Sequence, residues 1–307
     1  MGRYVARRLL QAIPVFFGTT FMIFALVFAL PGDPIRALSG DKPISPAVYA
    51  ELQDRYNLDD PLLVQYGKYM GNLVQLDFGQ DFRGREVSDI MAERFPVTIK
   101  LALVAFGFEI LIGIMAGVLA GLRRGSYIDN LVLLTTTLVV SIPVFVLGFT
   151  AQVLLGVKLD WFPIAGLSQG WYSYLLPGLV LGALSLAYIA RLTRTSLVEN
   201  MRSDYVRTAT AKGLTRSRVV GRHALRNSLI PVITYLGVDL GALMGGAIVT
   251  EGIFNIPGVG QQVFQSIRSQ EGPVVVGIVT ALVLVFIVAN LIVDVLYAVL
   301  DPRIRYE

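Results

Sequence analysis

The residues that could do chemistry in the apolar stretches of this chain are carboxylates. They are Glu109, Asp239 and Asp294, each set among uncharged residues. Carboxylates in such stretches are rare, and they mark either a solute pathway or a polar link between helices. Because the three lie on separate stretches and at different expected depths, they give poor support to the carboxylate pair that an intramembrane enzyme would need.

Composition argues against other kinds of active site. The chain contains one histidine and no cysteine, which disfavours a zinc site and a Ser-His-Asp triad. It has no Gly-x-x-x-x-Gly-Lys-Ser/Thr loop to bind the phosphates of ATP. We therefore expect no catalytic, metal or cofactor site in this chain, and no enzymatic activity.

The elements that must position these carboxylates are long apolar stretches. The residues are 54% hydrophobic and only 16% charged, whereas a soluble protein carries about 25% charged residues. A membrane-spanning helix needs about 20 mostly apolar residues. Six stretches qualify, and they are 9–30, 97–122, 131–157, 172–190, 228–250 and 274–300. The first is too long for the core of a signal peptide and is expected to remain, so the sequence predicts an all-α membrane protein with six transmembrane helices.

The positive charges predict which loops face the cytoplasm. Sixteen Lys and Arg residues lie in 1–8, 123–130, 191–227 and 301–307, against one each in 158–171 and 251–273. Because cytoplasmic loops carry such an excess, both termini and the loop 191–227 are expected in the cytoplasm. The segments 31–96 and 251–273 are then external. The net charge of +4 reflects this topology, and we expect a lipid bilayer, not a nucleic acid, around the chain.

The expected external segment 31–96 predicts a folded aqueous part between the first two transmembrane helices. It has seven basic and eleven acidic residues, more charge than the chain as a whole. Short helices are expected over 45–56 and 61–76. The segment either covers the membrane bundle or docks an external partner, and the sequence favours neither.

The expected cytoplasmic loop 191–227 contains a further short helix. Ser203 or Asp204 can cap it, and Gly213 ends it at the position where a left-handed backbone is favoured. Its small residues Ala209, Ala211 and Gly213 permit close approach by another protein, and its Arg residues can pair with acidic groups there. The expected contact residues are Asp204, Tyr205, Arg207, Ala209, Lys212 and Gly213. The alternative is a basic loop that only sets topology or binds anionic lipid.

Seven motifs, in order along the whole chain, resemble those of one transporter family. They are LPGDP at 30–34, LDDPLLVQYGKYMGNL at 58–73, LDFG at 76–79, DYVRTATAKGL at 204–214, HALRNSLIPVIT at 223–234, EGIFNIPGVG at 251–260 and DPRIRY at 301–306. The family is the permease subunits of binding-protein-dependent ABC importers, in the dipeptide, oligopeptide and nickel branch. Arg207, Thr208 and Ala209 stand where the general importer signature has Glu-Ala-Ala, a departure common in peptide-type members.

The resemblance implies the type I ABC importer permease fold and a set of partners. These are a second homologous permease, two ATPase subunits that hold ATP and Mg, an external substrate-binding protein and a di- or oligopeptide substrate, in the cytoplasmic membrane of a bacterium or archaeon. The resemblance implies that the helix at 203–213 is the contact with the ATPases, with Tyr205 and Ala209 inserting and Arg207 and Lys212 pairing with acidic groups. Import of nickel or another small solute on the same scaffold stays open. A stand-alone secondary transporter is disfavoured because no inverted repeats are seen.

Three further sets of candidate residues follow from the implied transport path. Tyr235 and Asp239 are candidates for its lining, where Asp239 would attract the amino terminus of a peptide. The alternative for Asp239 is a hydrogen bond to a neighbouring helix. The candidates for an outer gate are Phe254, Pro257, Gly258 and Gly260. Gly237, Gly241 and Gly245 form a ridge for close packing, either between two permeases or within this chain.

Overall fold

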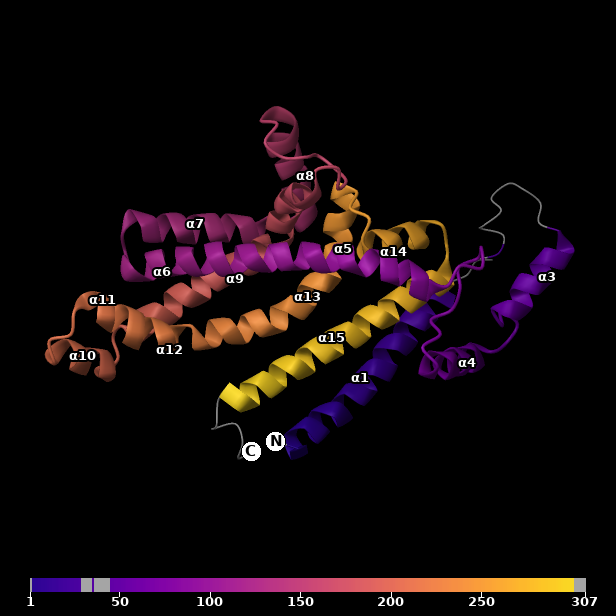
Figure 1. Ribbon diagram of the computed structural model, residues 1–307, viewed down its shortest axis with the longest axis horizontal. Coiled ribbons are helices and arrows are strands. Elements are labelled where there is room, and N and C mark those ends of the chain that lie inside the picture. The colour runs from indigo at the N-terminus through magenta and orange to yellow at the C-terminus, as the bar shows by residue number, and fades with distance from the viewer. Residues whose placement is uncertain (1, 29–34, 36–44, 301–307) are drawn as a thin grey trace. The chain divides into compact units, whose positions relative to one another are not determined.

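Figure 1 shows a computed structural model of the chain, which describes residues 2–28, 35 and 45–300. Over this part the chain is helical, apart from its loops and one isolated β-bridge. The all-α class expected from the sequence is confirmed. The chain divides into two compact units, one of Met1–Thr98 with Pro257–Glu307 and the other of Ile99–Ile256.

The apolar stretches form helices long enough to cross a membrane. Four described helices qualify singly: Ala6–Phe28, Val87–Leu122, Gly170–Asn200 and Gly272–Ile292. Two bent pairs also qualify: Tyr127–Ser141 with Val144–Lys158, bent by 107°, and Arg216–Ser228 with Ile230–Gly245, bent by 44°. When each bent pair is counted as one span, the described residues contain up to six candidate spans, the number that the sequence predicts.

The stretch 131–157 differs from the single helix expected there. It forms α7 (Tyr127–Ser141), α8 (Val144–Ala151) and the π-helical η2 (Gln152–Lys158). The break falls at Ile142, whose backbone is extended at φ −98° and ψ 126°. Ile142 precedes Pro143, and a residue before proline is driven out of the helical conformation by the proline ring.

The unit that contains both chain ends is built on two paired helices. Its helices are α1 (Gly2–Phe28), α3 (Pro46–Arg55), α4 (Leu62–Val74), the start of α5 (Val87–Phe108), α14 (Val259–Arg268) and α15 (Gly272–Leu300). α1 runs beside α15 (Figure 1), and α4 packs on α1. Gly277 permits a close approach within this unit, because a β-carbon there would lie 2.7 Å from the carbonyl oxygen of Phe78. The helices expected over 45–56 and 61–76 are α3 and α4, whereas the motifs at 30–34 and 301–306 lie outside the described residues.

The other unit is arranged around α9 (Leu175–Asn200), which packs against α6 (Ile114–Leu122), α7, α8 and α13 (Ile230–Phe254). The π-helical turn η1 (Glu109–Gly113) joins α5 to α6, and η3 (Gly170–Tyr174) leads into α9. The tightest approach is at Gly117 on α6. A β-carbon there would lie 2.5 Å from both the carbonyl oxygen of Ala190 and Cβ of Thr193, so only glycine allows this spacing.

Four short helices follow α9 in the same unit. They are α10 (Asp204–Ala211), α11 (Arg216–Arg218), the π-helical η4 (Val219–Leu225) and α12 (Arg226–Ser228). They lie together beyond the end of α9, and α12 leads into α13 (Figure 1). Pro231 stands in the first turn of α13, where its missing N–H costs no hydrogen bond.

Candidate functional site

The segment 203–213 forms the short helix that its sequence predicts. α10 begins after Ser203, whose backbone is extended, and Gly213 follows it at φ +77°, a conformation that glycine adopts without strain. The Ser203 hydroxyl does not cap the helix. It donates instead to the carbonyl oxygen of Asn200 at 2.5 Å, which ties the start of the segment to the end of α9.

The inner face of α10 packs on the chain itself. Val206 and Ala209 are 3% and 5% exposed, and they form one apolar cluster with Leu197, Val219 and Ala224. The expectation that Ala209 inserts into a partner is therefore wrong for this conformation. Its small side chain lets α10 lie close to the chain's own core. The signal that could have shown this is the three-residue spacing of Val206 and Ala209, the two buried residues of α10.

The outer face of α10 is exposed and carries charged side chains. The side chains of Asp204 and Arg207 are 97% and 74% exposed, and they form an ion pair at 3.6 Å. Tyr205 is 39% exposed, and its hydroxyl donates to Oδ1 of Asn200. Lys212 is also exposed. Four of the six expected contact residues thus share an accessible surface, which we call the α10 outer face: Asp204, Tyr205, Arg207 and Lys212.

The α10 segment is connected to two long helices of its unit. It follows α9 directly, and η4 packs against both α10 and α9. The hydroxyl of Ser228, on α12, donates at 2.7 Å to the carbonyl oxygen of Ala224 and lies 3.3 Å from that of Ser196 on α9. Displacement of α10 would therefore be passed to α9 and, through α12, to α13.

Two of the three apolar-stretch carboxylates meet inside the same unit. Glu109 on η1 is 0% exposed and Asp239 on α13 is 7% exposed, and their carboxyl groups are neighbours. Ser185 on α9 donates to Oδ1 of Asp239 at 2.8 Å, and the hydroxyl of Tyr235 donates to Ser185 at 3.4 Å. The expectation that the carboxylates lie apart is wrong for this pair, because helix pairing cannot be read from a single sequence. Asp294 lies on α15, in the other unit.

The three glycines of the predicted ridge on α13 differ in how deeply they are buried. Gly241 is buried and Gly237 is half-buried. Gly245 is exposed, and a β-carbon there would meet no atom within 4 Å. Use of Gly245 for packing against another chain stays a prediction.

The expected gate residues lie at the end of one helix and the start of another. α13 continues to Phe254, which is 1% exposed, and Asn255 ends it in the left-handed conformation. Gly258 precedes α14, and Gly260 is buried in its first turn. The sequence did not show that helix α13 extends this far. A gating role for these residues, including Pro257, stays a prediction.

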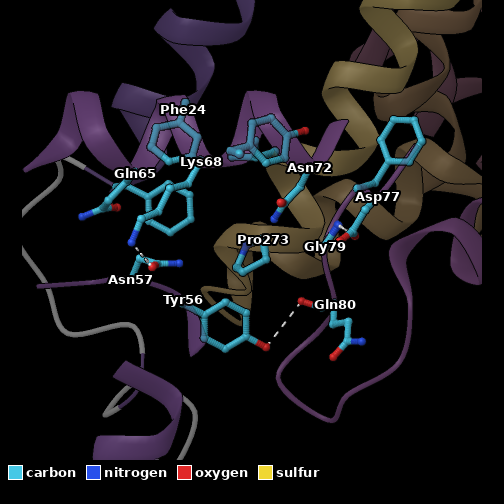
Figure 2. A pocket seen from close by; sticks show the side chains of 14 residues that line it. Phe24, Tyr56, Asn57, Gln65, Lys68, Asn72, Asp77, Gly79, Gln80 and Pro273 are labelled. Atoms are coloured by element: carbon cyan, nitrogen blue, oxygen red, sulfur yellow. Dashed lines mark hydrogen bonds between the residues drawn. The ribbon is translucent and has the colours of Figure 1, made fainter. Parts of the chain in front are cut away.

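A cavity of about 210 Å³ lies in the unit that contains the chain ends, between α1, α4 and the start of α15. Some of its polar groups bind one another, as Figure 2 shows for Lys68 with Asn57 and for the amide of Gly79 with Asp77. Burial raises the pKa of Tyr69 in its wall to about 12. Nothing in the sequence indicated this cavity.

Two family models together match nearly the whole chain. The binding-protein-dependent transport system inner membrane component matches residues 111–306, and the N-terminal part of such membrane components matches residues 1–102. The chain belongs to this family of transport permeases. The resemblance inferred from its motifs is thereby confirmed.

Relatives of this permease match it from end to end. It is 40% identical over 335 residues to the di/tripeptide transport system permease protein DppB of Pseudomonas aeruginosa, with 100% of both chains covered. It is 40% identical over 309 residues to the glutathione transport system permease protein GsiC of Escherichia coli K12, again with 100% of both chains covered. A dipeptide transport system permease protein DppB of Alkalihalophilus pseudofirmus is 37% identical over 336 residues, also with full coverage.

A solved structure of the MetNI methionine ABC transporter, in an inward-facing conformation, resembles this permease in fold. The TM-score is 0.52 at 21% identity, and the match covers 66% of the permease and 94% of that chain. The type I importer fold expected from the sequence is supported by this match.

Proposed function

We propose that the permease forms half of the path of an ATP-driven importer for di- and oligopeptides. The observation that carries this proposal is the full-length similarity, at 37–40% identity, to permeases named for di/tripeptide, dipeptide and glutathione transport. All three names specify peptides, which favours a peptide over nickel as the substrate. A second homologous permease would supply the other half of the path.

The α10 outer face is the proposed contact with the ATPase subunits. It is exposed and charged, and its helix is connected to α9 and α13 by packing and hydrogen bonds. The ATPases would hold ATP and Mg, since the sequence of the permease has no phosphate-binding loop of the common kind. Their closure would move α10 as a rigid lever and thereby shift the helices that border the path.

The topology is part of the proposal. The excess of Lys and Arg in 191–227 favours a cytoplasmic position for α10 and for both termini. The segment 31–96 is then external, and α3 and α4 within it are the proposed docking region for a substrate-binding protein. The membrane is the cytoplasmic membrane of a bacterium or archaeon.

Co-purification and reconstitution test this function. The permease is expressed with its candidate partner permease and ATPases, purified through a tag, and placed in proteoliposomes with the binding protein. The expected result is one complex that takes up labelled dipeptide only when ATP is present on the ATPase side. Uptake by the permease alone, or by the complete complex for nickel but not for any peptide, would contradict the proposal.

A further inference from the structure

The carboxylates of Glu109 and Asp239 are the least satisfied polar groups in the helices of their unit. Both oxygens of Glu109 and Oδ2 of Asp239 are buried without a hydrogen-bond partner. The fourth oxygen, Oδ1 of Asp239, accepts the hydrogen bond from Ser185. An unsatisfied buried polar group destabilises the folded state, and more so when it is charged. Three such atoms together call for a ligand that can join them.

The surroundings of the pair provide no positive charge. Within the described residues, neither carboxylate forms an ion pair with Lys or Arg. The titratable neighbours are the two carboxyl groups themselves and Tyr235, whose hydroxyl is directed to Ser185. Two negative charges side by side in a medium of low dielectric constant repel strongly, and such pairs keep a proton on one member.

The packing of α9 leaves room for the carboxyl group of Glu109. A β-carbon on Gly182 of α9 would lie 3.1 Å from Oε1 of Glu109, so glycine at that position leaves room for the carboxyl group. Glu109 also begins the π-helical turn η1. A π-helical turn contains one extra residue, which shifts the side chains that follow, and such turns are frequent at functional sites.

We propose that Glu109 and Asp239 form a binding site for a single shared proton. With the proton on Glu109, one of its oxygens becomes a donor to Oδ2 of Asp239. Asp239 then accepts two hydrogen bonds, one from Glu109 and one from Ser185, and two of the three unsatisfied atoms gain partners. The proton comes from hydronium in the solvent: one O–H bond of H₃O⁺ breaks, one O–H bond forms on Glu109, and a water molecule is left.

The bound proton links the helices that move when α10 is displaced. The shared proton joins η1 to α13, and Ser185 joins α13 to α9. Loss of the proton would leave two charges facing each other and would push α13 away from η1. This inference concerns the integrity of the helix bundle and does not depend on which solute the permease carries.

Infrared difference spectroscopy and thermal unfolding test the proton site on the purified complete transporter. The wild-type complex is expected to show a protonated-carboxyl band that shifts in D₂O and is absent from Glu109→Gln. Its melting temperature is expected to fall as the pH rises above the ordinary glutamate pKa and on toward the alkaline range, because the unfolded chain loses this proton first. Glu109→Gln, which keeps a donor but cannot titrate, is expected to show a smaller fall in melting temperature than the wild type over the same range.

Two further variants keep the test decisive. Asp239→Asn removes the neighbouring charge and is expected to make this loss of stability smaller without abolishing it, because Glu109 stays buried. The site is therefore tested even if Glu109→Gln fails to assemble. Glu199→Gln, an exposed carboxylate on α9, is the matched control and should retain the wild-type pH profile and band. Identical pH profiles for wild type and both site variants, or stability that follows the concentration of Na⁺ or K⁺ and not pH, would overturn the proposal.

Discussion

Arg194 on α9 binds both carboxylate oxygens of Asp129 on α7, with Nε at 2.6 Å from Oδ1 and Nη2 at 2.8 Å from Oδ2. The carboxylate also accepts from the amide of Gly125 at 2.8 Å, and its side chain is only 2% exposed. This two-point contact fixes the part of α9 that leads into α10. The helix that would receive a displacement of α10 is therefore held firmly against α7.

Breaking this ion pair should loosen α9. Arg194→Ala leaves the buried carboxylate of Asp129 without its charged partner, and we expect a loss of stability on the order of 2–3 kcal/mol. Thermal unfolding of the purified permease measures the change. Removing both groups in Asp129→Asn/Arg194→Ala should recover part of the loss, because no charge is then left buried. An unchanged melting temperature in Arg194→Ala would show that the contact does not stabilise the unit.

Enlarging Gly117 should separate α6 from α9. The added methyl group of Gly117→Ala would lie 2.5 Å from the carbonyl oxygen of Ala190, so one helix has to move. Overpacking of this kind costs about 1–3 kcal/mol. The control is Gly107→Ala on α5, since a β-carbon there would meet no atom within 4 Å. Thermal unfolding of both variants distinguishes them, and equal stabilities would contradict the close approach.

Reversing a charge on the α10 outer face should weaken the contact with the ATPases. Arg207→Glu replaces an exposed cation without touching the buried Val206 and Ala209. We expect roughly tenfold weaker binding, which is about 1.4 kcal/mol, together with reduced ATP-driven uptake and unchanged membrane insertion. Lys158→Glu, an exposed basic residue at the end of η2, is the control. Wild-type affinity and uptake in Arg207→Glu would remove this residue from the contact.

Glu271, just before α15, should make stability depend on pH. Burial, and the nearby carboxylate of Asp81, raise the pKa of Glu271 above its usual value. The unfolded chain therefore loses this proton first, and stability falls as the pH rises from the ordinary glutamate pKa to the raised one. Glu271→Gln should flatten this decline in thermal unfolding as the pH rises above the ordinary glutamate pKa, whereas Asp54→Asn, which removes an exposed carboxylate, should not. A decline of equal size in Glu271→Gln would contradict the assignment.

The sequence predicted the features of this fold that depend on local patterns. The apolar stretches, the helices at 45–56 and 61–76, and the end of α10 at Gly213 all follow from hydrophobicity, helix periodicity and the backbone freedom of glycine. The 107° bend before α8 was missed. Pro143 was visible in the sequence, but a proline in a long apolar stretch can either kink a helix or end it.

What the sequence could not provide were contacts between elements. Glu109 and Asp239 are 130 positions apart in the chain, and only the packing of η1 and α13 on α9 brings them together. The same reason explains why the burial of Ala209 against its own chain was not predicted. Its size suggested contact with a partner, but whether a small residue faces a partner or its own core depends on where α9 and η4 lie.

The most direct test of the account is a crosslink from the α10 outer face to the ATPases. The permease has no cysteine, so one introduced cysteine can carry a photoreactive benzophenone at a single known place. In the assembled transporter, a probe at Arg207→Cys is predicted to form a covalent adduct with an ATPase subunit. A probe at Trp171→Cys, whose native side chain is 64% exposed on the proposed external side, should form none. An intact complex in which the probe at 207 never reaches an ATPase, or in which the probe at 171 does, would contradict the account.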